Sequence, residues 1–183
     1  MACPPSHLRN LLPGGACLKP GRIQQQDGRV WILATSASAT GCCPTCQRTS
    51  SLIHSRYWRA VRDLPWQGAP VELRVEIRRF RRRVRDGPRK TCVQRLPMVM
   101  ARQARQTARL SETIRLIGYA LGGEAGSRLA TRLGLETSPD TVLRRVKRGP
   151  SVTAASSVEA VGVHDWAWRP GQRYGTILAD LEQ

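Results

Sequence analysis

The sequence has few acidic residues and no long apolar run. Its 13 Asp and Glu stand against 30 Lys and Arg in 183 residues, which leaves a net charge of +17. No segment approaches the roughly 20 apolar residues of a membrane-spanning helix, which excludes a helical membrane protein. The N-terminal stretch MACPPSHLRNLLPGGACLKPG has no uninterrupted apolar core that could serve as a signal peptide. We therefore expect a soluble chain in a reducing cytoplasm, without a membrane partner.

The six cysteines contain one spaced pair and no second one. Cys43-Pro44-Thr45-Cys46 has the spacing of a zinc knuckle, in which two thiolates from one tight turn occupy two corners of a tetrahedron. A structural zinc site needs four ligands, and the remaining candidates, Cys42, His54 and Cys92, lack pair spacing. The sequence therefore predicts half of a zinc site, formed by Cys43 and Cys46, and leaves zinc binding open.

The positive charge is concentrated in one segment. Between residues 72 and 95 there are nine Arg and one Lys against three acidic residues, an excess of 10 − 3 = +7. Apolar and charged residues alternate from Val71 to Arg78, which predicts a half-buried strand with a charged face that could line a phosphate backbone. A solvated basic face without a partner is the alternative. The candidate DNA-binding residues here are Arg78, Arg79, Arg81, Arg82 and Arg83.

The segment after residue 98 has a helical period. We expect helices at about 104–120, 124–133 and 139–148; Ser138 is a suitable N-cap for the third, and Pro139 suits its first position. This pattern predicts a helix-turn-helix whose third helix contacts double-stranded DNA. An ordinary three-helix core with a basic surface is the alternative. The DNA-binding candidates on the third helix are Arg144, Arg145, Lys147 and Arg148.

The C-terminal stretch GVHDWAWRPGQRYGTILADLEQ predicts two strands joined by a turn. A two-stranded hairpin cannot bury enough surface to be stable alone in water, so we expect it to belong to a larger sheet. His164 and Asp165 are adjacent near the end of the first strand, where they first suggest a catalytic pair.

Several stretches, in this order, resemble bacterial insertion-sequence transposases with an N-terminal zinc finger, a helix-turn-helix and a catalytic domain of the DDE type. The stretches are CPTCQRTSSLIHSRYWRAVRDLPWQGAPVELRVEIRRF, RKTCVQRLP, LGGEAGSRLATRLGLETSPDTVLRRVKR and VGVHDWAWRPGQRYGTILADLE. In the family, two cysteines follow the first stretch. The corresponding positions here are Arg82 and Gly87, and Cys92 stands where the family has an aromatic residue. The resemblance thus implies that the second half of the zinc site is lost.

The resemblance also implies a damaged catalytic site. The family carries an Asp-Asp pair where this chain has His164 and Asp165, and its leading Asp is the first of three acids that bind Mg²⁺. Mg²⁺ prefers hard oxygen ligands, so His164 is a poor replacement, and Asp165 faces the other side of the strand. The other two acids are expected beyond residue 183. Whether the chain is an enzyme stays uncertain; we expect it to be truncated and inactive alone, without productive Mg²⁺ binding.

The expected fold class is α+β. It combines a small β-rich, zinc-finger-like domain, a three-helix helix-turn-helix and a β-hairpin from an incomplete ribonuclease-H-like domain. The expected parts are a loose leader at 1–21, the degenerate zinc-finger domain at 22–97, the helix-turn-helix at 98–149, a linker at 150–157, and the hairpin at 158–183.

The leading functional prediction is a transposase N-terminal fragment that binds the terminal inverted repeats of an insertion sequence in the bacterial cytoplasm, associated with the nucleoid. One alternative is a DNA-binding regulator that competes with a full-length transposase, with a second copy or that transposase as its partner. Others are a non-functional pseudogene product and an active enzyme split by a frameshift.

Overall fold

The computed structural model describes residues 11–44, 46–81, 90–149, 160–169, 171 and 173–180. The chain divides into two units, Met1–Gly149 and Pro150–Gln183. The expected linker at 150–157 and the first ten residues of the expected leader lie outside the described residues.

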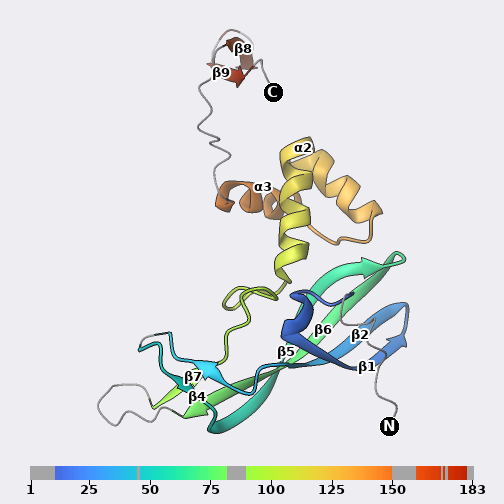
Figure 1. The fold of residues 1–183 in the computed structure, drawn as a ribbon. Helices are drawn as coiled ribbons and strands as arrows, with labels where there is room; N and C mark the ends of the chain where they lie inside the picture. The colour runs from blue at the N-terminus through green and yellow to red at the C-terminus, as the bar shows by residue number, and fades with distance from the viewer. Residues whose placement is uncertain are drawn as a thin grey trace. The chain divides into compact units, whose positions relative to one another are not determined.

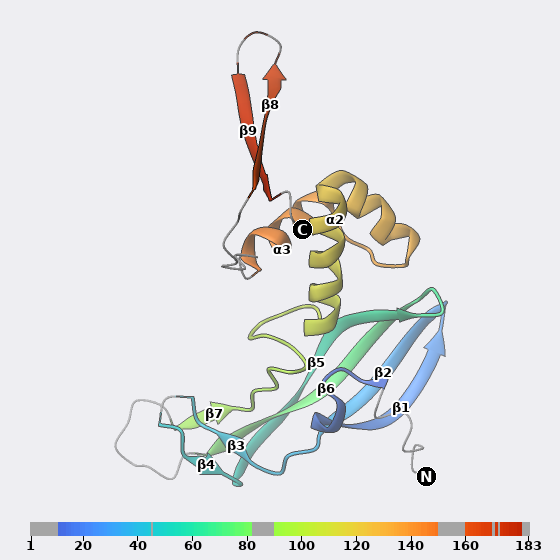
Figure 2. The same cartoon turned by 45° about the horizontal axis from the view of Figure 1, so that its top comes forward.

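The larger unit contains a five-stranded sheet. Figures 1 and 2 show β1, β2, β6 and β5 side by side in this order, and β7 pairs with the end of β6. The pairing of β2 with β6 is parallel and the others are antiparallel. The strands are β1 (Leu18–Gln26), β2 (Arg29–Ser36), β5 (Ile53–Trp66), β6 (Ala69–Arg81) and β7 (Thr91–Val93). Three smaller elements are the 3₁₀-helix η1 (Gly15–Cys17) and the paired strands β3 (Gly41–Cys42) and β4 (Thr49–Ser50).

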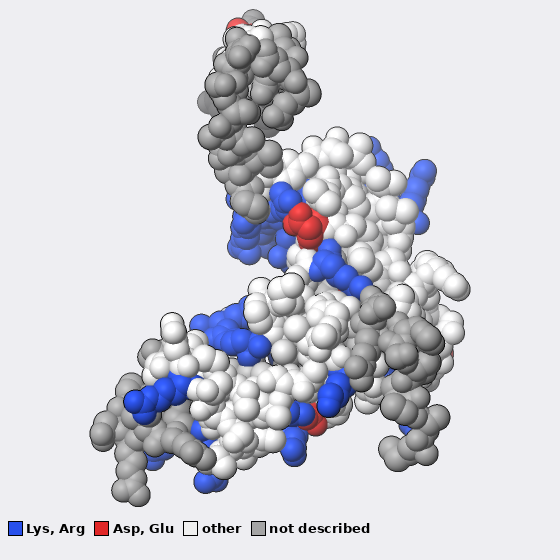
Figure 3. Space-filling model, viewed as in Figure 1, with Lys and Arg blue, Asp and Glu red and all other residues white. Residues whose placement is uncertain are grey.

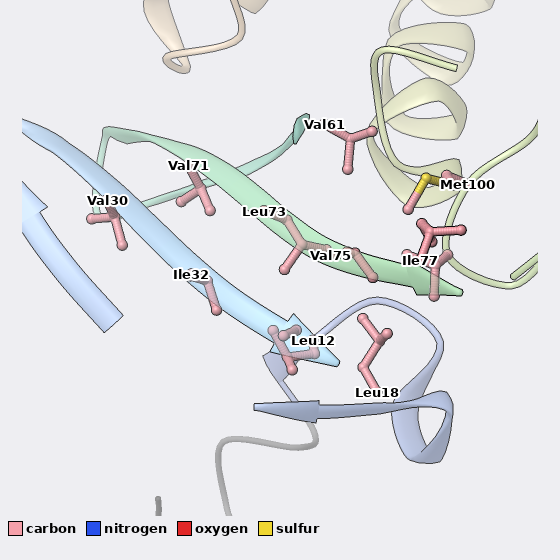
Figure 4. Packing of buried hydrophobic residues seen from close by; sticks show 12 residues of the cluster. Leu12, Leu18, Val30, Ile32, Val61, Val71, Leu73, Val75, Ile77 and Met100 are labelled. Atoms are coloured by element: carbon pink, nitrogen blue, oxygen red, sulfur yellow. The ribbon is translucent and has the colours of Figure 1, made fainter. Parts of the chain in front are cut away.

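The apolar residues of β2 and β6 form the core of this unit. Successive side chains of a strand point to opposite faces, so the alternation of apolar and charged residues separates a buried face from a solvent face. Figure 4 shows the buried residues of both strands, together with Leu12, Leu18 and Met100, which cover this face. The buried strand residues are Val30, Ile32, Ala34, Val71, Leu73, Val75 and Ile77.

The expected three-helix helix-turn-helix is wrong. The described residues contain two α-helices, α2 (Ala108–Arg132) and α3 (Pro139–Arg148), and the unit is dominated by strands. The backbone of Gly122 is not helical, with φ 70° and ψ −167°, so α2 consists of two helical arms joined by a kink at the Gly122-Gly123 pair. One glycine with positive φ therefore produces a kink where the sequence predicted a helix end.

Helix α3 packs closely on α2. Its N-cap Ser138 accepts a hydrogen bond from the Thr141 amide (3.3 Å), and its fully buried Val142 faces α2 at Gly118. A Cβ added at Gly118 would lie 2.7 Å from both Val142 Cγ1 and Val146 Cγ2. The two helix backbones therefore approach closely because position 118 has no side chain.

Replacing Gly118 with Ala should lower the free energy of unfolding by about 1 to 2 kcal/mol. Overpacking costs about 1 to 3 kcal/mol, and the better helix propensity of Ala returns up to about 1 kcal/mol. Gly126→Ala is the matched control in the same helix, because its added Cβ would come no closer than 3.4 Å to a neighbour. Urea unfolding measures both variants. A Gly118→Ala protein as stable as Gly126→Ala would contradict the close packing.

A buried carboxylate connects the sheet to the start of α2. The Asp63 side chain of β5 has no exposed surface, and it accepts hydrogen bonds from Thr107 Oγ1 (2.7 Å) and Arg109 Nε (2.8 Å). Thr107 is also the N-cap of α2, where its Oγ1 accepts from the Leu110 amide (3.3 Å). The amides of Arg62 and Thr107 donate to the carbonyls of Arg105 and Arg62, respectively. The helices are thus fixed to β5 by the segment just before α2.

The smaller unit is an antiparallel hairpin of β8 (Val161–Arg169) and β9 (Arg173–Asp180). Several of its apolar side chains are largely exposed, namely Val161, Val163, Ile177 and Leu178. Figure 2 shows the two strands lying next to each other.

Neither described helix combines the length and the apolar character that crossing a membrane would require.

Candidate nucleic-acid interface and cysteine knuckle

The cysteine knuckle, residues 41–50, is the turn that joins β3 to β4. Its buried Cys43 donates its amide hydrogen to the Arg48 carbonyl (3.0 Å) and accepts at its own carbonyl from the Gln47 amide (2.8 Å). Cys43 packs in one small cluster with the fully buried Phe80 of β6 and with Cys92 of β7, and Cys46 lies at its edge. The backbone of Gly41 lies so close to the Phe80 ring that an added Cβ would collide with it.

The donor set of the cysteine knuckle does not fit a closed four-ligand zinc site. The cluster brings Cys43, Cys46 and Cys92 near one another around an aromatic ring, yet the described residues contain no group of three or more His, Cys, Asp or Glu arranged to hold a metal. The segment 82–90, where a second ligand pair is expected, has no Cys or His in its sequence. Phe80 packs in the same cluster as Cys43 and Cys92.

The arginines predicted on β6 divide between two roles. Arg78 is largely buried: it lies 3.5 Å from the Glu76 carboxylate, and its Nη1 donates to the Ser38 carbonyl (2.9 Å). Arg79 is exposed and stacks on the Tyr57 ring, 5.4 Å from its centroid, and Arg81 is exposed at the strand end. Arg79 and Arg81 thus keep their charge exposed, whereas Arg78 uses its charge within the protein. Arg82 and Arg83 lie outside the described residues.

Three of the four predicted residues of α3 are exposed, namely Arg144, Lys147 and Arg148. Figure 3 shows Lys and Arg side chains gathered over α3. The fourth, Arg145, is partly buried and donates from Nη2 to Gln106 Oε1 (2.9 Å), which ties α3 to the segment before α2. Arg145 therefore serves first to hold the helix in place.

Arg115 of α2, which lies next to Gly149 at the end of α3, is paired with an acidic residue. Arg115 of α2 forms an ion pair with Glu112, and the hydrogen bond that it donates lowers the pKa of the Glu112 carboxyl below its usual range. Arg115 also stacks on Tyr119, with 5.0 Å to the ring centroid. Arg115 is thus paired within α2 itself.

The side chains of His164 and Asp165 lie on opposite faces of β8. Both are exposed on β8, and adjacent residues of a strand face opposite sides. Asp165 Oδ1 accepts a hydrogen bond from Thr176 Oγ1 (2.6 Å) on β9, whereas His164 pairs in register with Ile177. The geometry assigns Asp165 to a cross-strand contact.

Sequence reasoning missed the aromatic partners of the arginines. Arg74 lies over Trp31, 5.1 Å from the ring centroid, as Arg79 lies over Tyr57. The period of two along β5, which puts Tyr57 on the same face as Val61, is the signal that could have identified Tyr57.

One comparison with known proteins gave a match. A family model described as the zinc finger of transposase IS204/IS1001/IS1096/IS1165 matches residues 39–81, which are 43 of the 183 residues. This segment is similar to a transposase zinc ribbon. It spans the cysteine knuckle, β5 and β6 and ends just before Arg82. The match supports a transposase-family N-terminus and makes zinc binding plausible, although the knuckle supplies an incomplete ligand set.

The comparisons with curated proteins and with solved structures gave no match.

Proposed function

We propose that this chain is the DNA-binding part of an insertion-sequence transposase and that it binds the terminal inverted repeats of its element as duplex DNA. The similarity of residues 39–81 to a transposase zinc ribbon carries the proposal. The net charge of +17 supports it, because a surface with so large a positive excess attracts nucleic acid. The bacterial cytoplasm, at the nucleoid, is the compartment that this function implies.

The contacts proposed for duplex DNA come from two surfaces of the larger unit. Arg144, Lys147 and Arg148 form one, on the exposed side of α3, and Arg79 and Arg81 form the other at the end of β6. These cations neutralise phosphates, and each neutralised phosphate releases a counterion. Zinc, if bound, would be held through Cys43 and Cys46 of the cysteine knuckle.

We also propose that the chain does not cut DNA by itself. Two-metal phosphoryl transfer needs carboxylates that hold divalent cations, and an exposed imidazole at His164 does not supply one. Asp165 is engaged with Thr176 on the other side of the hairpin. Mg²⁺-dependent cleavage of end-containing DNA by the purified chain would contradict this proposal.

The exchange of all three exposed cations of α3 for Ala should weaken duplex binding and reduce its salt dependence. Removing three phosphate contacts should lower the slope of log K against log salt concentration by up to about 2.7. The variant is Arg144→Ala, Lys147→Ala and Arg148→Ala together, and fluorescence anisotropy over a salt series measures it. The charge-matched control removes Arg22, Arg128 and Arg132, which are exposed elsewhere. Equal slopes for wild type and the α3 variant would contradict the contact.

A second proposed function is that of a regulator, because His164 stands where the resembling family has a metal-binding Asp. A chain that occupies element ends without cutting them would compete with a full-length transposase for the same DNA. Its addition to a cleavage reaction of such an enzyme should reduce cleavage in step with occupancy of the ends, and unchanged cleavage at full occupancy would argue against competition.

A further inference from the structure

A hollow of about 770 Å³ lies on the inner face of the sheet, beyond the end of the apolar core. Its floor comes from β5, β6 and β7, and its wall from the segment that runs from Gln94 to Gln103. We call it the arginine groove, because Arg59, Arg79, Arg95 and Arg102 line it together with Tyr57. None of its lining residues is an Asp or a Glu.

The arginines of the groove form no ion pairs with acidic residues in the described part of the chain, unlike the arginines on the opposite face of the sheet. There, Arg74 is 2.7 Å from Glu72, and Arg56 is 3.5 Å from Glu76. Within the described part of the chain, no ion pair involves an arginine of the groove. Several cations in one concave site, with walls of lower dielectric constant, focus a positive potential on whatever enters it. The expected occupant is therefore an anion.

Two of the arginines are held in place before any ligand arrives. Arg59 Nη2 donates to the Ala104 carbonyl (2.7 Å), which fixes it across the groove. Arg79 stacks on Tyr57, which itself packs against the apolar core. Arg95 and Arg102 are exposed on the opposite wall. The groove thus offers a stacking surface and cations on two sides.

Shape and chemistry together favour a single strand over a duplex. A duplex keeps its bases stacked inside and could present only phosphates to a hollow of this size, so the Tyr57 and Arg79 pair would have no partner. Proteins that bind single strands combine a positive groove, which follows the backbone, with aromatic rings on which bases stack. The volume lies within the range of about 300 to 1,000 Å³ that is usual for ligand sites.

We propose that the arginine groove binds a short single-stranded segment of nucleic acid. A base stacks against the Tyr57 and Arg79 pair, and Arg59, Arg95 and Arg102 contact the phosphates on either side. This site is separate from α3 and adds a second nucleic-acid partner to the duplex proposed above.

The test compares two probes on the full chain. One is a labelled oligothymidylate of about 12 nucleotides, within the site sizes known for single-strand-binding folds. The other is a duplex whose strands have the same length. The groove variant carries Arg95→Ala and Arg102→Ala, and the charge-matched control carries Arg22→Ala and Arg128→Ala, all at exposed positions.

The groove variant should bind the oligothymidylate at least about tenfold more weakly than the control variant does, and the two should bind the duplex equally. Tyr57→Leu should weaken oligothymidylate binding about tenfold, the loss of one stacked base, and Tyr57→Phe should retain it.

Circular dichroism checks the fold of each variant, and the arginine variants decide the question if Tyr57→Leu does not fold. Equal losses in the groove and control variants, or a groove variant that loses only duplex binding, would overturn the proposal. Failure of α3 to bind duplex would leave this outcome unaffected.

Discussion

Replacing Asp63 with Ala is expected to destabilise the chain by about 3 kcal/mol, the lower end of the cost of breaking a buried ion pair. The Asp63 carboxylate is fully buried and accepts from Thr107 and twice from Arg109, at Nε and at Nη2 (2.5 Å). Removal of the carboxylate leaves these donors without their acceptor. The lower end is expected because the Arg109 side chain is 30% exposed and can partly regain water.

Urea unfolding followed by circular dichroism measures the Asp63→Ala variant. Glu72→Ala is the control, because it breaks an exposed pair with Arg74 on the same sheet and should cost less than about 1 kcal/mol. Thr107→Ala should cost an intermediate amount, since it removes one donor to Asp63 and the N-cap of α2. Similar stabilities of Asp63→Ala and Glu72→Ala would show that the network does not hold the helices to β5.

Replacing Phe80 with Ala is expected to cost about 3 to 5 kcal/mol, as for other fully buried aromatic residues. The ring fills the space between Gly41, Cys43 and Cys92, so its removal leaves a cavity under the cysteine knuckle. Part of the loss should appear as local opening of the knuckle, because β3 and β4 form a separate two-stranded sheet.

Two comparisons separate packing from metal binding at the knuckle. Phe80→Leu keeps an apolar side chain there and should cost clearly less than Phe80→Ala. Wild-type protein unfolded in the presence of a chelator should lose much less stability than the Phe80→Ala variant does. A loss on chelation as large as that of Phe80→Ala would show that a metal, and not the packed ring, holds the knuckle.

Local patterns in the sequence indicated the strands and the start of α3. The alternation from Val71 to Arg78 follows from the pleat of β6, and Ser138 with Pro139 marks the start of α3. The number of helices was predicted wrongly because a glycine pair can end a helix or kink it. The two outcomes differ in the backbone conformation at Gly122, which the local sequence does not determine.

Contacts between distant residues could not be predicted from spacing. Asp63 and Arg109 are 46 positions apart, and nothing near Asp63 marks it as the buried member of a pair. Cys92 stands far from the other cysteines in the sequence, yet β7 brings it to Phe80 and Cys43. Likewise, sequence alone could not distinguish Arg78, used in an internal pair, from its exposed neighbour Arg79.

Recognition of the ends of an insertion sequence is the property that the proposed function requires. The most direct test measures binding of the full 183-residue chain to duplexes taken from the DNA on both sides of its gene, against scrambled duplexes of equal composition, over a series of salt concentrations. We expect the chain to bind the end-derived duplexes more tightly, with a preference that persists as salt weakens both complexes. Equal affinity for both duplexes at every salt concentration would contradict it and leave only nonspecific attraction between a basic protein and DNA.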